Sequence, residues 1–113
     1  MSKRQLKLLL EDILESAEKI ISYTRGLTYE EFIVDSKTID AVVRNFEIIG
    51  EAANRLPDEF KELHNEIDWH KMRGLRNRIV HNYFGIDYII IWSVKQNYLS
   101  ALITQVTELL DNY

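Results

Sequence analysis

A helical period is plain in residues 36–55, which read SKTIDAVVRNFEIIGEAANR. Apolar residues recur there at three- and four-residue steps, the spacing of one face of an α-helix. They are Ile39, Val42, Val43, Phe46, Ile49 and Ala53. Proline disfavours helical backbone in the residue before it, so Pro57 marks an end to this pattern. We therefore predict a long helix over residues 36–55, with a corner at Leu56-Pro57.

The same criteria predict helices before and after this segment. The predicted elements are helices over residues 3–25, from Thr28 onward, over 58–63, from Asp68 until Gly85, and over 87–111, with a loop at 64–66. Gly26 is the expected stop of the first helix, and Thr28-x-x-Glu31 has the form of a capping box. These lengths and short connections predict an all-α, antiparallel bundle of four to five helices, one domain covering residues 1–113.

Composition limits the classes of protein that fit. The chain has 113 residues, 46% of them hydrophobic, no cysteine and a net charge of −4. It can form no disulfide, and an acidic protein is a poor candidate for bulk, non-specific nucleic-acid binding. Glu11 and Asp12 interrupt the first apolar run, and no uncharged apolar stretch approaches the ~18 residues of a membrane span. We expect a soluble, cytoplasmic protein.

Basic residues gather in the segment from Asp68 to Tyr83. It holds Lys71, Arg73, Arg76 and Arg78 against Asp68 alone, so it carries +3 in a protein whose total is −4. This distribution suits a confined anion site better than a long nucleic-acid track, although charge alone fits a solvated basic helix face equally well.

Helical geometry separates two faces of this segment. With about 100° per residue and Arg76 at zero, Met72, Leu75, Ile79 and Tyr83 cluster near ~300°, whereas His81 lies near ~140°. His81 is therefore predicted to point away from the core. Arg76 and His81 are also too far out of register to form a pair on one regular helix. Either the helix distorts, or a two-fold dimer brings two such helices to one cleft.

Arginine, histidine and a nearby polar side chain can attack a phosphodiester without a metal. Histidine accepts or donates a proton near neutral pH, and a guanidinium binds phosphate oxygens and stabilises charge in the transition state. RNA supplies its own nucleophile, the 2′-hydroxyl, which DNA lacks. The candidate catalytic residues are Arg76, His81 and Asn77, and the expected substrate is RNA rather than DNA.

The run Arg76-x-x-x-x-His81-x-Tyr83, with Asn77 directly after the arginine, resembles the signature of the HEPN superfamily and specifically of its HepT-like toxins. The similarity extends over most of the chain, including residues 44–53 and 69–75. It implies a HEPN-like fold and a metal-independent endoribonuclease that acts as a homodimer, the toxin of a type VII-like toxin–antitoxin pair. The implied partner is an MntA-like nucleotidyltransferase antitoxin.

The resemblance also assigns roles to residues. Arg76 would bind the scissile phosphate, His81 would transfer the proton, and Asn77 would orient the phosphate or the histidine. Tyr83 matches the tyrosine to which the antitoxin attaches AMP, but its helical position also fits a core aromatic. Arg73, Arg78 and Arg44 are candidates for flanking phosphate contacts or, alternatively, solvated surface arginines.

Other patterns point to no further site. Asp40, Arg44, Glu47 and Glu51 are expected to form an exposed ion-pair ladder. His64 and His70 fit no common metal spacing, so we expect no metal and no cofactor. Two rival functions stay open: a non-catalytic module that binds a nucleotide or substrate for a nucleotidyltransferase, and a purely structural helical dimer. His81 and Asn77 favour catalysis, because arginines alone would serve phosphate binding.

Overall fold

The computed structural model describes residues 1–81 and 87–113, and leaves the side chains of Val80 and His81 outside that description. Within the described residues the chain is helical, without strands. The helices are α1 (Lys3–Thr24), α2 (Tyr29–Phe32), α3 (Ser36–Arg55), α4 (Asp58–Leu63), α5 (Trp69–His81), α6 (Tyr88–Asn97) and α7 (Leu99–Leu110). The predicted all-α fold is confirmed.

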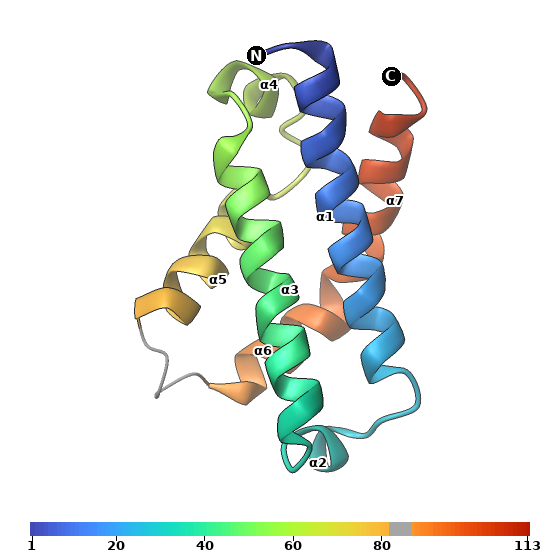
Figure 1. Ribbon diagram of the computed structural model, residues 1–113, viewed down its shortest axis with the longest axis vertical. Helices are drawn as coiled ribbons and strands as arrows, with labels where there is room; N and C mark the ends of the chain where they lie inside the picture. Colours follow the sequence, from blue (N-terminus) through green and yellow to red (C-terminus); the bar gives the residue numbers. More distant parts are fainter. Residues whose placement is uncertain (82–86) are drawn as a thin grey trace.

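The long helices alternate in direction, which makes an antiparallel bundle. In Figure 1, α1 descends from the N-terminus, α3 returns beside it, α5 descends, and α6 with α7 climbs back to the C-terminus. Helix α3 packs against α1 on one side and α5 on the other, and α7 packs against α1. The apolar stripes of these helices face inward, so that Ile13, Phe46 and Leu102 are all nearly or fully buried in the core.

Local signals at the helix ends behave as predicted. Gly26 adopts a φ of 79°, a backbone conformation that glycine tolerates and that ends α1. Thr28 and Glu31 form both hydrogen bonds of a capping box at the start of α2. Asp68 accepts a hydrogen bond from the backbone N–H of Lys71 at 3.0 Å, which satisfies one free donor at the start of α5.

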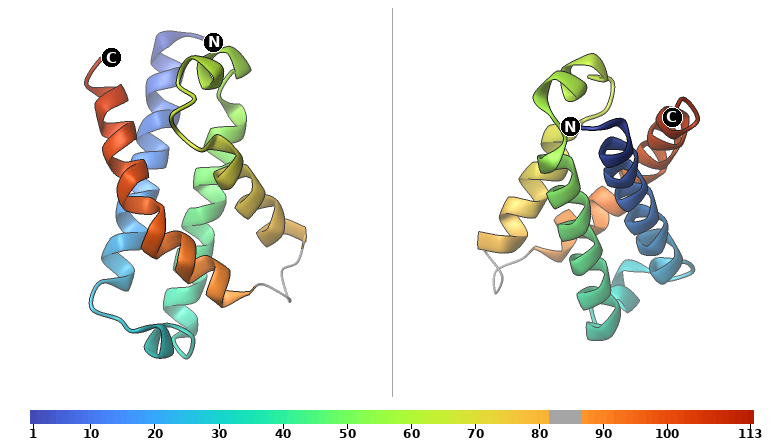
Figure 2. Two further views of the ribbon diagram at one scale, coloured as in Figure 1. Left: turned by 180° about the vertical axis from the view of Figure 1, so that it is seen from behind. Right: turned by 45° about the horizontal axis from the view of Figure 1, so that its top comes forward.

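The prediction of one helix over residues 87–111 was wrong. Tyr98 adopts φ −124° and ψ −40°, which separates α6 from α7, and Figure 2 shows the bend from behind. The Tyr98 hydroxyl donates to the backbone carbonyl of Asp68 at 2.8 Å, so the bend is tied to the start of α5. Burial, together with the nearby Asp68 carboxylate, raises the pKa of Tyr98 above its usual value.

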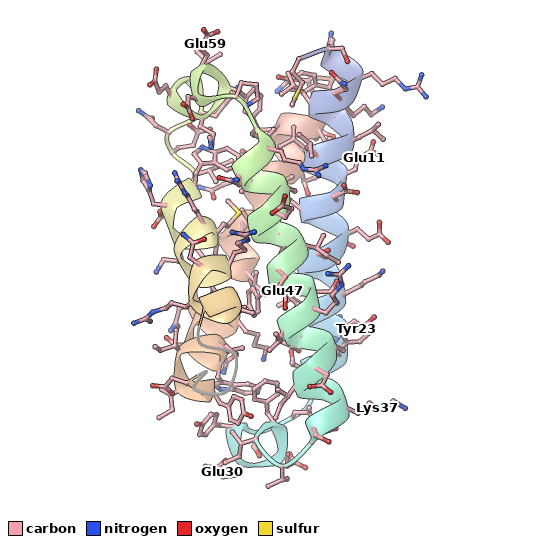
Figure 3. The ribbon with its side chains drawn as sticks, turned by 60° about the vertical axis from the view of Figure 1, so that its left-hand side comes forward. Glu11, Tyr23, Glu30, Lys37, Glu47 and Glu59 are labelled. Atoms are coloured by element: carbon pink, nitrogen blue, oxygen red, sulfur yellow. The ribbon has the colours of Figure 1, made fainter. Side chains whose placement is uncertain are left out.

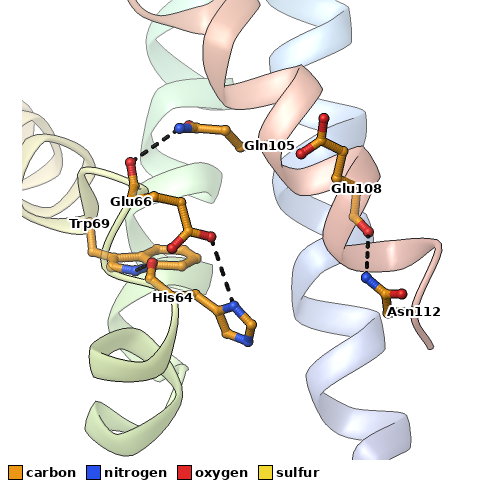
Figure 4. A network of polar contacts seen from close by, with 6 residues as sticks. All are labelled: His64, Glu66, Trp69, Gln105, Glu108 and Asn112. Atoms are coloured by element: carbon orange, nitrogen blue, oxygen red, sulfur yellow. Dashed lines mark hydrogen bonds and ion pairs between the residues drawn. The ribbon is translucent and has the colours of Figure 1, made fainter.

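Two further hydrogen bonds hold the loop that precedes α5. Gln105 Nε2 on α7 donates to the carbonyl of Glu66 at 3.1 Å, and the indole N–H of Trp69 donates to the carbonyl of His64 at 3.0 Å (Figure 4). The loop carbonyls are thus satisfied by side chains from α7 and α5. As a result, the beginning of α5 is anchored to α7 independently of the contacts that α5 makes with α3.

Candidate active site

Helix α5 buries one face and exposes another. The exposed fractions of Met72, Leu75 and Ile79 are 3%, 7% and 1%. The burial of these three residues on one face, predicted from helical geometry, is confirmed. Asn77 is exposed, and the side chain of Arg76 is 32% exposed at the border between the two faces. Arg76 therefore combines a packed stem with a solvent-accessible guanidinium, as arginine commonly does.

Helix α3 approaches α5 very closely at Gly50. A Cβ atom added to Gly50 would overlap the Cβ of Arg76, and would lie 2.8 Å from its Cγ and 3.0 Å from the carbonyl oxygen of Met72. Only a residue without a side chain leaves this space free. The absence of a side chain at position 50 thus lets the Arg76 stem lie directly on α3.

The guanidinium of Arg76 has two acceptors, one from each helix. Its Nη1 donates to Oδ1 of Asn77 at 3.2 Å, and its Nη2 lies 3.3 Å from Oε2 of Glu51. The other oxygen of Glu51, Oε1, lies 3.5 Å from Nε of Arg55 one turn further along α3. Arg76, Glu51 and Arg55 therefore form a continuous charged network.

A groove with a volume of about 350 Å³ lies over α3 beside this network. Figure 3 shows α3, which carries Glu47, between α5 and α1. The groove is lined by Leu9, Asp12, Arg44, Glu47, Ile48, Glu51, Ala52, Arg55 and Arg76. Three arginines and three carboxylates face each other here, so the charges of the groove balance.

The structure brings only some of the predicted phosphate ligands together. Arg44 shares the groove with Arg76, although its side chain is 71% exposed and its Nη1 lies 3.9 Å from Oε2 of Glu47. Arg73 instead lines a separate hollow of about 340 Å³ with Trp69 and His70. Arg78 is exposed on α5. The predicted ladder on α3 holds for Arg44 and Glu47, whereas Glu51 pairs with Arg55 and, across to α5, with Arg76.

Two of the predicted site residues fall outside what the structure describes. The side chain of His81, the last described residue of α5, is not described, and Tyr83 lies in the segment 82–86 that is not described. The predicted roles of His81 and Tyr83 therefore stay predictions. Among the described residues, no three His, Cys, Asp or Glu side chains gather in a way that could hold a metal ion. No helix in that part of the chain is long and apolar enough to span a membrane.

Glu51 and Gly50 are the site residues that sequence reasoning missed. Glycine in a helix interior costs about 1 kcal/mol relative to alanine, so a glycine inside the helical pattern of residues 36–55 was a signal of close packing. No comparable signal marked Glu51. Its spacing from Arg55 fits an ordinary intrahelical ion pair, and its contact with Arg76 depends on how α3 and α5 pack.

Comparison with known proteins gives matches over most of the chain. A family model described as "Ribonuclease HepT-like" matches residues 13–109. The chain is 39% identical over 110 residues to a Methanocaldococcus jannaschii protein named "Putative RNase", covering 97% of this chain and 91% of that protein. It is 43% identical over 100 residues to "Probable ribonuclease HepT" of Thermococcus cleftensis, covering 88% and 91% of the two chains. No solved structure reaches a significant match.

Proposed function

The chain belongs to the HepT-like ribonuclease family, and on that premise we propose that it is a metal-independent endoribonuclease. The observation that supports this most directly is the state of Arg76. Two acceptors hold its guanidinium, while about a third of its side chain stays exposed beside an open groove. A preorganised, accessible guanidinium is what stabilisation of a phosphoryl transition state requires.

In the proposed reaction, Arg76 binds the scissile phosphate and stabilises the negative charge that develops on it. His81 accepts the proton of the adjacent 2′-hydroxyl, whose oxygen attacks phosphorus. The bond from phosphorus to the 5′-oxygen breaks, and that oxygen accepts a proton from a His81 imidazolium and leaves as a hydroxyl. The products are a 2′,3′-cyclic phosphate and a 5′-hydroxyl end, so no water or metal takes part in the cleavage step. Asn77, which already binds Arg76, keeps the guanidinium turned toward the phosphate.

We place this chemistry in a homodimer. Arg76 and His81 are five residues apart on α5, so a regular helix directs them about 140° apart. Two copies of α5 related by a two-fold axis would bring both arginines and both histidines to one cleft. The dimer thus supplies the proximity that a single helix lacks.

The family resemblance supports a regulatory setting for this activity. We propose that the chain is the toxin of a toxin–antitoxin pair in the cytoplasm, silenced when an MntA-like nucleotidyltransferase attaches AMP to Tyr83. AMP on Tyr83, two residues after His81, would add bulk and negative charge next to the proton-transfer group. Arg73, Arg78 and Arg44 are proposed to contact phosphates that flank the cleavage site.

Cleavage of RNA in excess EDTA tests the proposed function. The purified protein should cut single-stranded RNA, leave the DNA analogue intact and produce 2′,3′-cyclic phosphate ends. His81→Ala and Arg76→Ala should each lose on the order of a hundredfold or more in rate. Arg76→Lys should restore only part of the rate, because an ammonium cannot bind phosphate in a bidentate manner.

Equal RNA cleavage by wild type and His81→Ala would contradict this mechanism. The observed activity would then belong to another site or to a contaminant. Binding of RNA or nucleotide without any cleavage would favour the rival function, a binding partner of a nucleotidyltransferase.

A further inference from the structure

We propose that Glu51 is a positioning residue, which holds the Arg76 guanidinium in the orientation that receives the scissile phosphate. The inference rests on the ribonuclease function proposed above. It adds a residue from α3 to a site that the motif places entirely on α5 and the residues after it. The carboxylate acts through Arg76 and does not itself contact RNA.

The contacts of Arg76 define the plane of its guanidinium. The group is planar, so two acceptors on different terminal nitrogens, Glu51 on Nη2 and Asn77 on Nη1, fix its orientation. Asn77 is the next residue on α5 and moves with Arg76, whereas Glu51 belongs to α3. The Glu51 contact therefore ties the guanidinium to the rest of the bundle. Among the described residues, these two acceptors engage two of the five N–H donors, and the remaining donors can bind phosphate oxygens.

The backbone around Glu51 is itself held in place. Gly50 brings α3 against the stem of Arg76, so the residue that follows it is delivered to the guanidinium by helix packing. Arg55 Nε contacts Glu51 Oε1, and Arg76 Nη2 contacts the other oxygen, Oε2. The carboxylate is thus oriented by a partner of its own before it orients Arg76.

A positioning role has a kinetic signature that a role in folding lacks. Glu51 places a negative charge near the phosphate site, so replacing it with glutamine should leave RNA binding equal or tighter. The same change loosens the guanidinium, so the transition state should lose stabilisation that the ground state does not need. The expected result is a lower kcat per mole of folded protein, together with an unchanged or lower KM. Loss of folded protein would instead lower the amount of active enzyme and leave KM as it was.

Glu51→Gln and Glu47→Gln form a matched pair of variants. Both residues lie on the same face of α3 and line the same groove, and both substitutions remove one negative charge. Glu47 pairs with Arg44, whereas Glu51 pairs with Arg76. We expect Glu51→Gln to lower kcat roughly tenfold, as for a catalytic group that is imperfectly placed. Glu47→Gln should stay within about twofold of wild type in kcat.

A double-mutant cycle shows whether Glu51 acts through Arg76. In an Arg76→Lys background the planar fork is already lost, so adding Glu51→Gln should lower kcat by less than about twofold more. A further tenfold loss in that background would mean that Glu51 acts elsewhere, and the proposal would be overturned.

Side-chain nitrogen relaxation of Arg76 Nε tests the inference even if the protein cleaves no RNA. The Arg76 Nε–H vector should be ordered in wild type and in Glu47→Gln, and mobile in Glu51→Gln. An equally ordered Arg76 in Glu51→Gln would refute the positioning role. Inactive wild-type protein with a loosened Arg76 in Glu51→Gln would instead count against the ribonuclease function while supporting the Glu51 contact.

Discussion

Replacing Gly50 with alanine tests how the site is assembled. A Cβ at this position would lie 2.8 Å from Cγ of Arg76, with still closer overlap at the Arg76 Cβ, where ordinary carbon contacts are about 3.5–4.0 Å. The Arg76 Cβ is bonded to the backbone, so the overlap is relieved only if α3 and α5 separate locally, by about 1 Å. We expect Gly50→Ala to disturb both stability and the Glu51–Arg76 contact.

Gly74 on α5 is the matched control for this substitution. A Cβ added to Gly74 meets nothing within 4 Å in the part of the chain that the structure describes. Alanine gains about 1 kcal/mol of helix propensity at either glycine, so this gain cancels when the two variants are compared. The remaining difference is the cost of overpacking, about 1–3 kcal/mol.

The two alanine variants should therefore move in opposite directions. Gly74→Ala should be more stable than wild type, and Gly50→Ala should unfold about 8 °C below Gly74→Ala, taking roughly 4 °C per kcal/mol for a domain of this size. A shift of about 1 Å in Arg76 should also lower RNA cleavage by on the order of a hundredfold. Calorimetry and a cleavage assay measure both effects. Equal melting temperatures for the two variants would refute the close approach of α3 to α5.

Three further predictions concern the bend, the dimer and the modification. Tyr98→Phe should cost about 1 kcal/mol of stability by removing the hydrogen bond to the Asp68 carbonyl. Burial raises the Tyr98 pKa in the folded state, so the contribution of Tyr98 to stability is complete below the unfolded pKa of 10.0 and is lost as pH rises above it. Unfolding of the variant should therefore depend less on pH in this alkaline range than unfolding of wild type. Light scattering should show a dimer at micromolar concentration. Mixing inactive Arg76→Ala with inactive His81→Ala should restore about a quarter of the wild-type activity if each site takes its arginine and its histidine from different protomers. It should restore none if each site takes both residues from one protomer. Incubation with the nucleotidyltransferase and ATP should add AMP to wild type but not to Tyr83→Phe, as mass spectrometry would reveal, and an adduct that persists in Tyr83→Phe would remove the proposed role.

Local chemistry along the chain was enough to predict most of the helices. The capping box at Thr28 and Glu31, the stop at Gly26 and the cap at Asp68 depend on residues within three or four positions of each other. Such contacts involve only residues that are close in the sequence, so they can be predicted without knowledge of the fold. The buried face of α5 was predictable for the same reason, because helical geometry alone sets which side chains share a face.

The bend at Tyr98 shows where local reasoning failed. Residues 87–111 have a continuous helical pattern of apolar residues. Helical backbone hydrogen bonds also continue on both sides of the bend, because the N–H of Tyr98 donates to the carbonyl of Val94 and the N–H of Leu102 donates to the carbonyl of Tyr98. The bend coincides with a hydrogen bond to Asp68, thirty positions earlier in the chain. The spacing of apolar residues along a helix does not predict a contact between residues that far apart in the sequence.

Sequence alone therefore predicted the helices apart from the division of residues 87–111, their inward faces, and Arg76 and Asn77 as candidate catalytic residues. Only the tertiary structure decided that α3 approaches α5 closely at Gly50 and that Glu51 contacts Arg76 on α5 as well as Arg55 on its own helix. The reason is physical. Contacts within a helix follow from its period, whereas a contact between α3 and α5 depends on how far each helix slides and rotates against the other, and the packing of the whole core sets that register.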